Sequence, residues 1–554
     1  MKVQVIQQND IAKKNSKPQF KGGADAFLRY LATNQAVGAN GIDLVAMVIP
    51  RTTTDLVSRG PAAGLETARR EASGTINHTL VGVFGIFAGS LIAAAMGINR
   101  KFNAGANKIM TAPETLNILA ENKASQVKNN THQIEYLKET LKNVKAFNPS
   151  ADGADEKGFV KLSQETIDDV ARILDYAIND KEMNFSKWSK KGTADSMHVV
   201  MNKIIADTGA ESRYVLESAT KDSKSNTNLK TLLEDIFKVS ESFNKKPVME
   251  AFEEQIRNNN GIDKNKYIQA LTKFNKRKSA AGFAIATGVG MSIQPLNIYL
   301  TKKKTGSDGF VGVEGRQKDK SAGFLGLRIA SSVAFFGMVL ATLQTGLKGF
   351  MDKMSFKGFW PTIPQLKGIY GLTIISRLLA TRDKDELREA LTKDTLGFLS
   401  WLVLGDFVNK ITAESLDKSV MNRTAEVSKK SWASRIFNSS LKTRDEILIE
   451  TLTEGLSHSE KQAKITKKVG DKTVAKTFKE LLSDLDQMPE SVKVKAKKRL
   501  GTLNKAQMAG YLFSGLVLGL GIPNLNIYIT NKLDKQRKAK AAAKAEAEAQ
   551  EAVA

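Results

Sequence analysis

Two short segments of similar sequence carry the charged side chains best suited to chemistry. They read SRGPAAGLETARREA and SRLLATRDKDELREA, and both contain an early Ser-Arg pair and a final Arg-Glu-Ala. A guanidinium can pair with a carboxylate, as in a salt bridge near a membrane surface, or hold the phosphate of an anionic lipid headgroup. An exposed amphipathic helix is the alternative interpretation. The candidate residues are Arg59, Arg70, Glu71, Arg377, Arg388 and Glu389.

The residue types used in metal, redox and thiol chemistry are scarce. The chain has no cysteine, which excludes disulfides, Cys-ligated metals and thiol nucleophiles, and its four histidines show no metal-ligand spacing. The sequence also contains no phosphate-binding glycine loop, zinc signature or nucleophile elbow. We therefore predict no catalytic residue, no metal site and no cofactor, and we do not expect an enzyme.

The chain of 554 residues is strongly basic, with 83 Lys and Arg against 58 Asp and Glu and a formal charge of +25. Such an excess can attract nucleic acid or an anionic membrane. Aromatic residues make up only 7% of the chain and lie mainly inside apolar runs, not among the basic residues where they could stack on bases. Because Lys and Arg clusters border the apolar runs, we expect anionic lipid headgroups as partners and no nucleic acid.

Several apolar runs rich in Gly, Ala and Ser resemble membrane-spanning helices. The strongest, residues 80–98, has no charged residue over roughly the 20 residues that a spanning helix needs. Small residues let helix backbones approach closely within a bilayer. Alternatively, the runs are core helices of a large soluble protein. The remaining predicted apolar helices lie near residues 280–300, 329–345, 395–409 and 509–529.

A stretch that ends in Leu-Asn-Ile-Tyr occurs twice. LTKFNKRKSAAGFAIATGVGMSIQPLNIYLTKK aligns without a gap on LGTLNKAQMAGYLFSGLVLGLGIPNLNIYITNK, and roughly a third of the positions are identical. Because an Asn within a membrane needs a polar partner, the motif could line a polar path. The alternative is structural, with each Tyr anchored at the membrane interface. The motif residues are Asn297, Tyr299, Asn526 and Tyr528.

The two repeated features occur in the same order, which predicts a tandem duplication. Each unit contains a charged segment, an apolar helix, a helical insert and a second apolar helix. The predicted organisation is a polar N-terminal segment at 1–40, repeat unit 1 at 41–304 with its insert at 100–278, a linker at 305–359, repeat unit 2 at 360–532 with its insert at 410–507, and a charged Ala/Lys/Glu tail at 533–554.

Apolar residues spaced three and four apart predict that both inserts are helical. Basic residues follow each Leu-Asn-Ile-Tyr helix, so the positive-inside rule puts those helix ends in the cytoplasm and both inserts on the opposite side. There the inserts could bind a protein partner. The two clearest apolar stripes in the first insert are Ile167, Val170, Ala171 and Leu174, and Leu229, Leu232, Leu233 and Ile236.

The predicted fold class is mainly α, with multi-pass membrane helices, an internal tandem duplication and two helical extramembrane inserts. The expected location is a membrane, specifically the bacterial plasma membrane. The first hypothesis for function is a non-enzymatic scaffold or interaction protein. The alternatives are a transporter or channel at the pseudo-symmetric interface between the repeats, and a secreted protein that inserts into membranes. The scarcity of charged residues within the apolar runs argues against transport.

Overall fold

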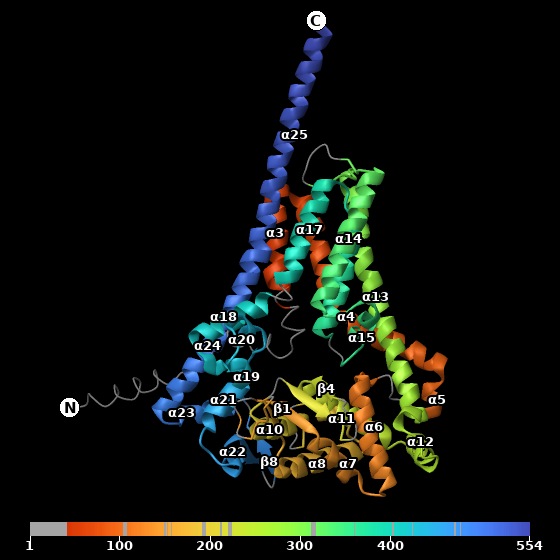
Figure 1. Cartoon of the computed structure of the whole chain (residues 1–554), viewed down its shortest axis with the longest axis vertical. Helices are drawn as coiled ribbons and strands as arrows, with labels where there is room; N and C mark the ends of the chain where they lie inside the picture. Colours follow the sequence, from red (N-terminus) through yellow and green to blue (C-terminus); the bar gives the residue numbers. More distant parts are fainter. Residues whose placement is uncertain are drawn as a thin grey trace, which may run out of the picture.

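The computed structural model is mainly helical, with 77% of its residues in helices. It has an upper bundle of long helices and a lower body of shorter helices and strands (Figure 1). The polar segment predicted at 1–40 lies outside the described residues. The structure describes residue 41 and residues 43–553, except for 103–107, 149–150, 152, 157, 191–194, 211–212, 220–223, 312–316, 359–360, 401–403, 424, 470–471 and 477.

The bundle combines helices of both predicted units and of the linker between them. The first unit supplies η1 (Asp43–Val48), α3 (Ile49–Arg59), α4 (Pro61–Met96) and α13 (Lys266–Thr305), and the linker supplies α14 (Ala322–Thr342) and α15 (Leu347–Lys353). The second unit supplies α16 (Ile363–Ala380), α17 (Lys384–Leu399), η6 (Gly515–Gly521) and α25 (Ile522–Val553). Residues 533–553 of the charged tail predicted at 533–554 continue α25 away from the body (Figure 1).

Helices α4 and α13 approach closely because glycines lie where they cross. A Cβ added at Gly282 would lie 2.8 Å from the Cα of Gly85, and the ring of Phe356 packs against the same crossing. The absence of side chains at these positions lets the two backbones meet. A polar contact joins the same helices, since Asn77 Nδ2 donates to the Ala286 carbonyl at 2.7 Å.

Helix α13 continues through Pro295, although a proline removes one hydrogen bond from a helix. The carbonyl that loses its donor belongs to Met291, four residues earlier. Ser376 of α16 replaces that donor, because its Oγ donates to the Met291 carbonyl at 2.5 Å. A side chain of the second unit therefore completes the hydrogen bonding of a helix of the first.

The first insert folds into helices and a four-stranded antiparallel sheet of order β2-β1-β3-β4. In this sheet Lys145 lies opposite Lys161 on one side and Val215 on the other. All eight residues of the two predicted apolar stripes are buried in the core of this insert. The strands are β1 (Val144–Phe147), β2 (Phe159–Lys161), β3 (Tyr214–Glu217) and β4 (Lys224–Thr227), and the helices are α5 (Ile98–Phe102), α6 (Pro113–Lys128), α7 (Gln133–Lys142), α8 (Gln164–Asn179), α9 (Phe185–Trp188), α10 (Met197–Thr208), α11 (Leu229–Phe243), α12 (Lys246–Arg257) and η3 (Ile262–Lys264).

The second insert packs directly on the first, so the two form one body. Asn202 of the first insert donates from Nδ2 to the carbonyl of Lys476 at 3.2 Å. Leu448 and Leu452 of the second insert belong to the same apolar core as the first insert. The elements of the second insert are α18 (Gly405–Leu416), η5 (Lys418–Val420), β5 (Met421–Asn422), α19 (Ala425–Ser428), α20 (Trp432–Phe437), β6 (Ser440–Leu441), α21 (Arg444–Leu452), α22 (His458–Ile465), β7 (Thr466–Val469), β8 (Lys472–Ala475), α23 (Phe478–Asp486) and α24 (Glu490–Ser514).

One detail of the predicted organisation differs from the structure. The inserts are not helical alone, because each also contains strands of two to four residues. Strands this short show too few alternations of apolar and polar residues to be recognised in a sequence. The apolar segment predicted at 395–409 covers the end of α17, which ends at Leu399, and the start of α18, which begins at Gly405; Ser400 and Leu404 are also helical, and 401–403 lie outside the described residues.

Among the described residues, three helical stretches are long and apolar enough to cross a membrane. They are α4, α14, and the continuous stretch of α24, η6 and α25 over Glu490–Ala547. These stretches contain the runs predicted at 80–98, 329–345 and 509–529, apart from a few terminal residues. Only 33%, 22% and 39% of their most apolar parts are buried, so most of each faces outward.

Large apolar side chains are exposed mainly on the bundle. Within the described part of the first insert, residues 108–265, Tyr176 is the one large apolar side chain on the surface. The bundle exposes many on the outward faces of α4, α13, α14, η6 and α25, which together form an apolar outer surface. These include Leu65, Ile76, Val83, Phe87, Leu91, Val289, Leu296, Leu327, Val333, Leu516, Leu520 and Leu525.

Candidate functional site

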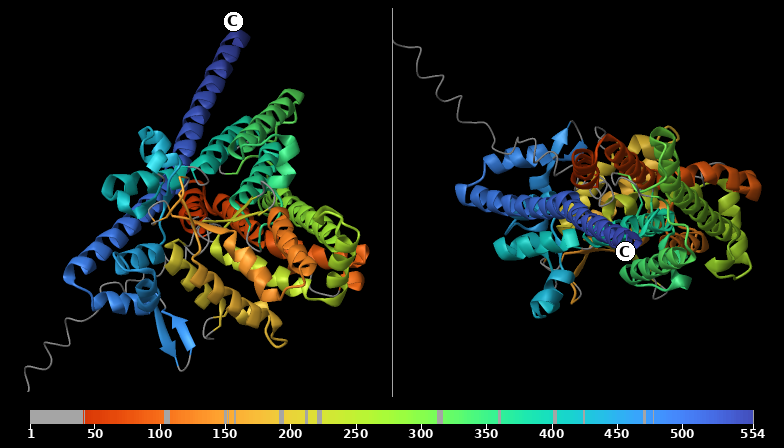
Figure 2. Two further views of the ribbon diagram at one scale, coloured as in Figure 1. Left: turned by 60° about the horizontal axis from the view of Figure 1, so that its bottom comes forward. Right: turned by 90° about the horizontal axis from the view of Figure 1, so that it is seen from above.

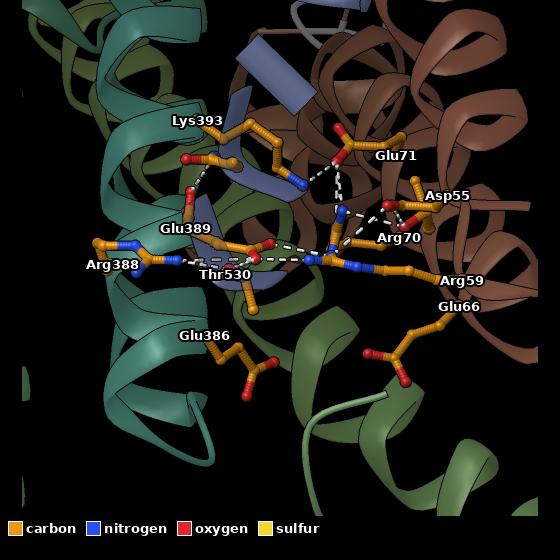
Figure 3. A network of polar contacts seen from close by, with 12 residues as sticks. Asp55, Arg59, Glu66, Arg70, Glu71, Glu386, Arg388, Glu389, Lys393 and Thr530 are labelled. Atoms are coloured by element: carbon orange, nitrogen blue, oxygen red, sulfur yellow. Dashed lines mark hydrogen bonds and ion pairs between the residues drawn. The ribbon is translucent and has the colours of Figure 1, made fainter. Parts of the chain in front are cut away.

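Charged side chains from both units form a buried network inside the bundle (Figure 3). Glu71 of α4 has four cationic neighbours. Arg51 Nη1 lies 3.3 Å from Glu71 Oε2, while Arg70 Nη2 lies 3.0 Å from Oε1. Arg377 Nη1 and Lys393 Nζ, both from the second unit, each lie 3.7 Å from Oε1. One carboxylate is therefore surrounded by cations from both halves of the bundle.

Two of these cations make further contacts that fix their positions. Arg377 Nη1 lies 2.5 Å from Oδ1 of Asp394, which is fully buried on α17. Arg51, with only 1% of its surface exposed, donates from Nε to the Leu518 carbonyl of η6 at 3.2 Å. That carbonyl is available because η6 is a π-helix, in which the regular hydrogen-bond ladder changes its spacing.

A second group of contacts lies nearer the end of the bundle that faces away from the body. Arg59 of α3 holds Glu389 of α17 with both terminal guanidinium nitrogens: Nη1 donates to Oε2 at 2.9 Å and Nη2 donates to Oε1 at 2.5 Å. The Thr530 hydroxyl of α25 also donates to Glu389, and Arg388 donates to that hydroxyl (Figure 3). The bidentate geometry gives this pair both strength and a fixed orientation.

Arg382, in the turn between α16 and α17, makes a third connection between the units. It donates to Glu386 of its own unit at 2.8 Å and to Glu66 of the first unit at 2.9 Å. Burying so many charges is costly unless each one is paired. The pairing of side chains from distant parts of the sequence therefore joins the two halves of the bundle.

The network encloses a small, partly open cavity, in which about 50 Å³ is open to the centres of water molecules. This is room for a few waters or for one small ion. The described charged residues that line it are Arg51, Asp55, Arg59, Glu66, Arg70, Arg377, Glu386, Glu389 and Lys393, and the other lining residues include Gln294, Phe310 and Asn526.

The repeated Leu-Asn-Ile-Tyr motif presents the same faces in both units. Asn297 and Asn526 are buried, whereas Tyr299 and Tyr528 are 61% and 64% exposed. Asn526 Nδ2 donates to the backbone carbonyl of Glu389 at 3.1 Å. The two tyrosines point out of the bundle and so do not line an internal path, while the two asparagines face its interior.

The residues that follow the motif make matching contacts. Arg69 of α4 donates from Nη2 to the hydroxyl of Thr301 at 3.0 Å, and Arg388 of α17 donates from Nη2 to the hydroxyl of Thr530. In the sequence Arg388 aligns with Arg70. In the structure the residue of the first unit that makes the matching contact is Arg69, one position earlier. Over residues 293–301 and 522–530, eight of the nine aligned positions share the same degree of burial.

All six charged candidates from the sequence lie in or beside this network. Arg59 reaches Glu389, Arg377 and Arg70 reach Glu71, and Arg388 reaches Thr530 and Asp385. None of the six lies on an exposed helix face, since their side chains are buried or mostly buried. Binding of a lipid headgroup by these residues stays a prediction.

Other members of the network were not found from the sequence. These are single charged residues in otherwise ordinary helices, and no repeated pattern marks them. The missed residues include Arg51, Glu66, Arg69, Arg382, Glu386, Lys393 and Asp394.

Comparison with known proteins gives no further guide, because no protein-family model, no curated protein and no solved structure matches this chain.

Proposed function

We propose that this chain is a multi-pass integral membrane protein that works as a scaffold or interaction protein. Its bundle crosses the bilayer, and the body formed by both inserts is held on one side to bind a protein partner. The observation that carries the proposal is the contrast between the apolar outer surface of the bundle and the polar surface of the first insert.

The energetics of apolar surface support this arrangement. Exposed apolar area is unfavourable in water by roughly 25 cal/mol per Å². Soluble monomers rarely expose large contiguous apolar patches. Helices surrounded by lipid can expose them, because lipid tails are themselves apolar. The same chain buries the apolar residues of its inserts well, so the exposed residues of the bundle are not a sign of poor packing throughout.

We further propose that the two units arose by duplication. The matching faces of the Leu-Asn-Ile-Tyr helices and the matching Arg-to-Thr contacts support this interpretation. Two related units that meet inside a membrane bundle are a common plan among membrane proteins.

Alkaline carbonate extraction of cell membranes tests the membrane proposal. The intact chain should stay in the membrane pellet, whereas release of the wild-type protein into the supernatant would contradict the proposal. Phe87→Lys, on an exposed face of α4, should weaken membrane retention or lower the amount inserted. Tyr176→Lys is the matched control, because it places the same charge on an exposed aromatic position of the body.

Transport of a small ion is the second candidate function. Its support is the charged cavity between the units. The cavity weakens the argument against transport that was based on the few charged residues in the apolar runs. The bundle has buried charges, although they lie outside those runs. Liposomes containing the purified protein should then pass ions faster than empty liposomes, and equal rates would exclude this function.

A further inference from the structure

We propose that the cavity within the network binds one small inorganic anion, held by Arg70, Arg377 and Lys393. The inference does not depend on either proposed function, because a bound anion can serve as a fixed part of the fold or as a passing solute. It depends on where the cations and carboxylates lie around the cavity.

The inner end of the cavity has an excess of positive charge. Arg51, Arg70, Arg377 and Lys393 all line the cavity and surround Glu71. Two carboxylates, Glu71 and Asp394, pair with these four cations. Neither carboxylate is among the described residues that line the cavity. Two positive charges remain, and one remains if the nearby buried Asp43 is also counted as ionised.

Several nitrogen atoms at this end lack a hydrogen-bond partner. Within the described part of the chain, Arg51 Nη2 and Arg377 Nε are buried and make no hydrogen bond. The Lys393 ammonium lies 3.7 Å from Glu71, beyond hydrogen-bond distance. Buried donors without acceptors are costly, and an anion beside Arg377 and Lys393 would supply acceptors to these two residues. Arg51 Nη2 lies against Gly397, which does not line the cavity.

Each carboxylate at the outer end of the cavity has a polar partner, but the four carboxylates share only two close cations. Glu389 is held by both nitrogens of Arg59, and Glu66 and Glu386 share Arg382. Asp55 accepts from the Thr67 hydroxyl at 2.5 Å. These four carboxylates pair closely with only two cations, Arg59 and Arg382, so they disfavour an anion at the outer end. An anion is therefore held at the inner end, where it meets guanidinium and ammonium groups.

The size of the cavity limits the ligand. The space of about 50 Å³ open to water centres admits chloride or inorganic phosphate, but not a large organic anion. Guanidinium groups match the geometry of oxyanions particularly well, so phosphate is the more informative probe and chloride the simpler one.

The test measures the thermal stability of the purified full-length protein in detergent. Chloride or inorganic phosphate replaces gluconate at constant ionic strength, since gluconate is too large for the cavity. We expect the melting temperature to rise with either small anion and to saturate, as linkage to a single site requires. Line broadening of the chloride NMR signal gives an independent measure of binding by the wild-type protein.

Two substitutions with opposite effects make the test specific. Lys393→Gln removes a cation and should weaken anion affinity by about tenfold or more, whereas Glu71→Gln removes the competing carboxylate and should strengthen it by a similar factor. Lys303→Gln changes an exposed lysine at the end of α13 and should leave the anion response unchanged.

Three results would overturn the proposal. One is the absence of a saturable response in the wild-type protein, by melting temperature and by NMR. Another is an equal anion response in the wild type and in Lys393→Gln, which would indicate a general salt effect. The third is a response to phosphatidylglycerol micelles but to neither free anion, which would assign the site to a lipid headgroup.

Discussion

Arg59 and Glu389 join α3 of the first unit to α17 of the second through a bidentate pair whose side chains are only 8% and 11% exposed. Removing one member of a buried ion pair leaves the other charge without compensation, which typically costs about 3–5 kcal/mol. Glu389→Ala should therefore lower the free energy of unfolding by about that amount, measured by titrating the detergent-solubilised protein with SDS.

The control for this prediction is Glu490→Ala, because that side chain is 73% exposed and its ion pair with Lys493 is loose at 3.7 Å. Its effect should stay below about 1 kcal/mol. Replacing both partners, as Arg59→Met with Glu389→Leu, should recover much of the lost stability. A double variant as unstable as Glu389→Ala would show that the charges themselves are needed.

Asp235 predicts a pH dependence for the body. It is buried on α11, accepts from the Thr111 hydroxyl at 2.7 Å, and burial raises its pKa to about 8. The folded protein therefore binds a proton that the unfolded chain releases near pH 4, so stability should fall as pH rises from about 4 to about 8. Asp235→Asn should remove this slope and gain on the order of 2–4 kcal/mol at pH 8.

The fluorescence of Trp188 can follow this transition, because its ring is buried and stacks on Phe237 at 4.9 Å. The three other tryptophans would be replaced by phenylalanine. Glu250→Gln, at an exposed site, should keep the wild-type slope. The same slope in Asp235→Asn as in the wild type would contradict the assignment.

At the residue scale, the sequence predicted charged groups where they were repeated. Arg70 and Arg388 could be recognised because the same residues, Glu and Ala, follow each of them, and both lie in or beside the network. Lys393 and Asp394 lie in a helix of ordinary composition. Their ion pairs, with Glu71 and Arg377, join residues from separate segments of the sequence. No local pattern encodes such a contact, so they could not be predicted.

Among the elements, the long apolar helices were predictable because each contains a long run of apolar residues that is visible in the sequence itself. The short strands were not, since pairing of β1 with β3 depends on tertiary contacts across more than one helix. The continuation of α13 through Pro295 could not be predicted from the sequence either, because the replacement donor, Ser376, belongs to another unit.

The crossing of α4 and α13 gives a prediction about glycine. Gly282→Ala would place a methyl group 2.8 Å from the Cα of Gly85, so the helices must separate. A loss of about 1–3 kcal/mol is expected, as for other overpacked sites. The midpoint of SDS-induced unfolding would report it.

Gly288→Ala is the matched control on the same helix. A Cβ at Gly288 meets nothing within 4 Å, so this substitution should stabilise the protein by up to about 1 kcal/mol through helix propensity alone. Similar effects of the two substitutions would show that the close crossing does not contribute to stability.

At the scale of the whole molecule, the most informative feature is the joint body. The basic residues that follow each repeated helix predict that both inserts lie on the same side of the membrane. In the structure both inserts lie at the same end of the bundle and share one apolar core, while α25 points the other way (Figures 1 and 2). No local pattern predicts the shared core, because it joins residues that lie far apart in the sequence.

This arrangement predicts the sidedness of the protein in the membrane. The chain has no cysteine, so single cysteines can be introduced at Lys181 and Glu454, on the two inserts, and at Lys540, on the exposed part of α25. A membrane-impermeant maleimide added to intact cells should label the first two positions, and Lys540→Cys should react only after the membrane is opened. The cysteine-free parent should not react. Labelling of Lys181→Cys and Glu454→Cys from opposite sides would contradict a joint body, whereas labelling of both from the cytoplasm alone would reverse the predicted topology.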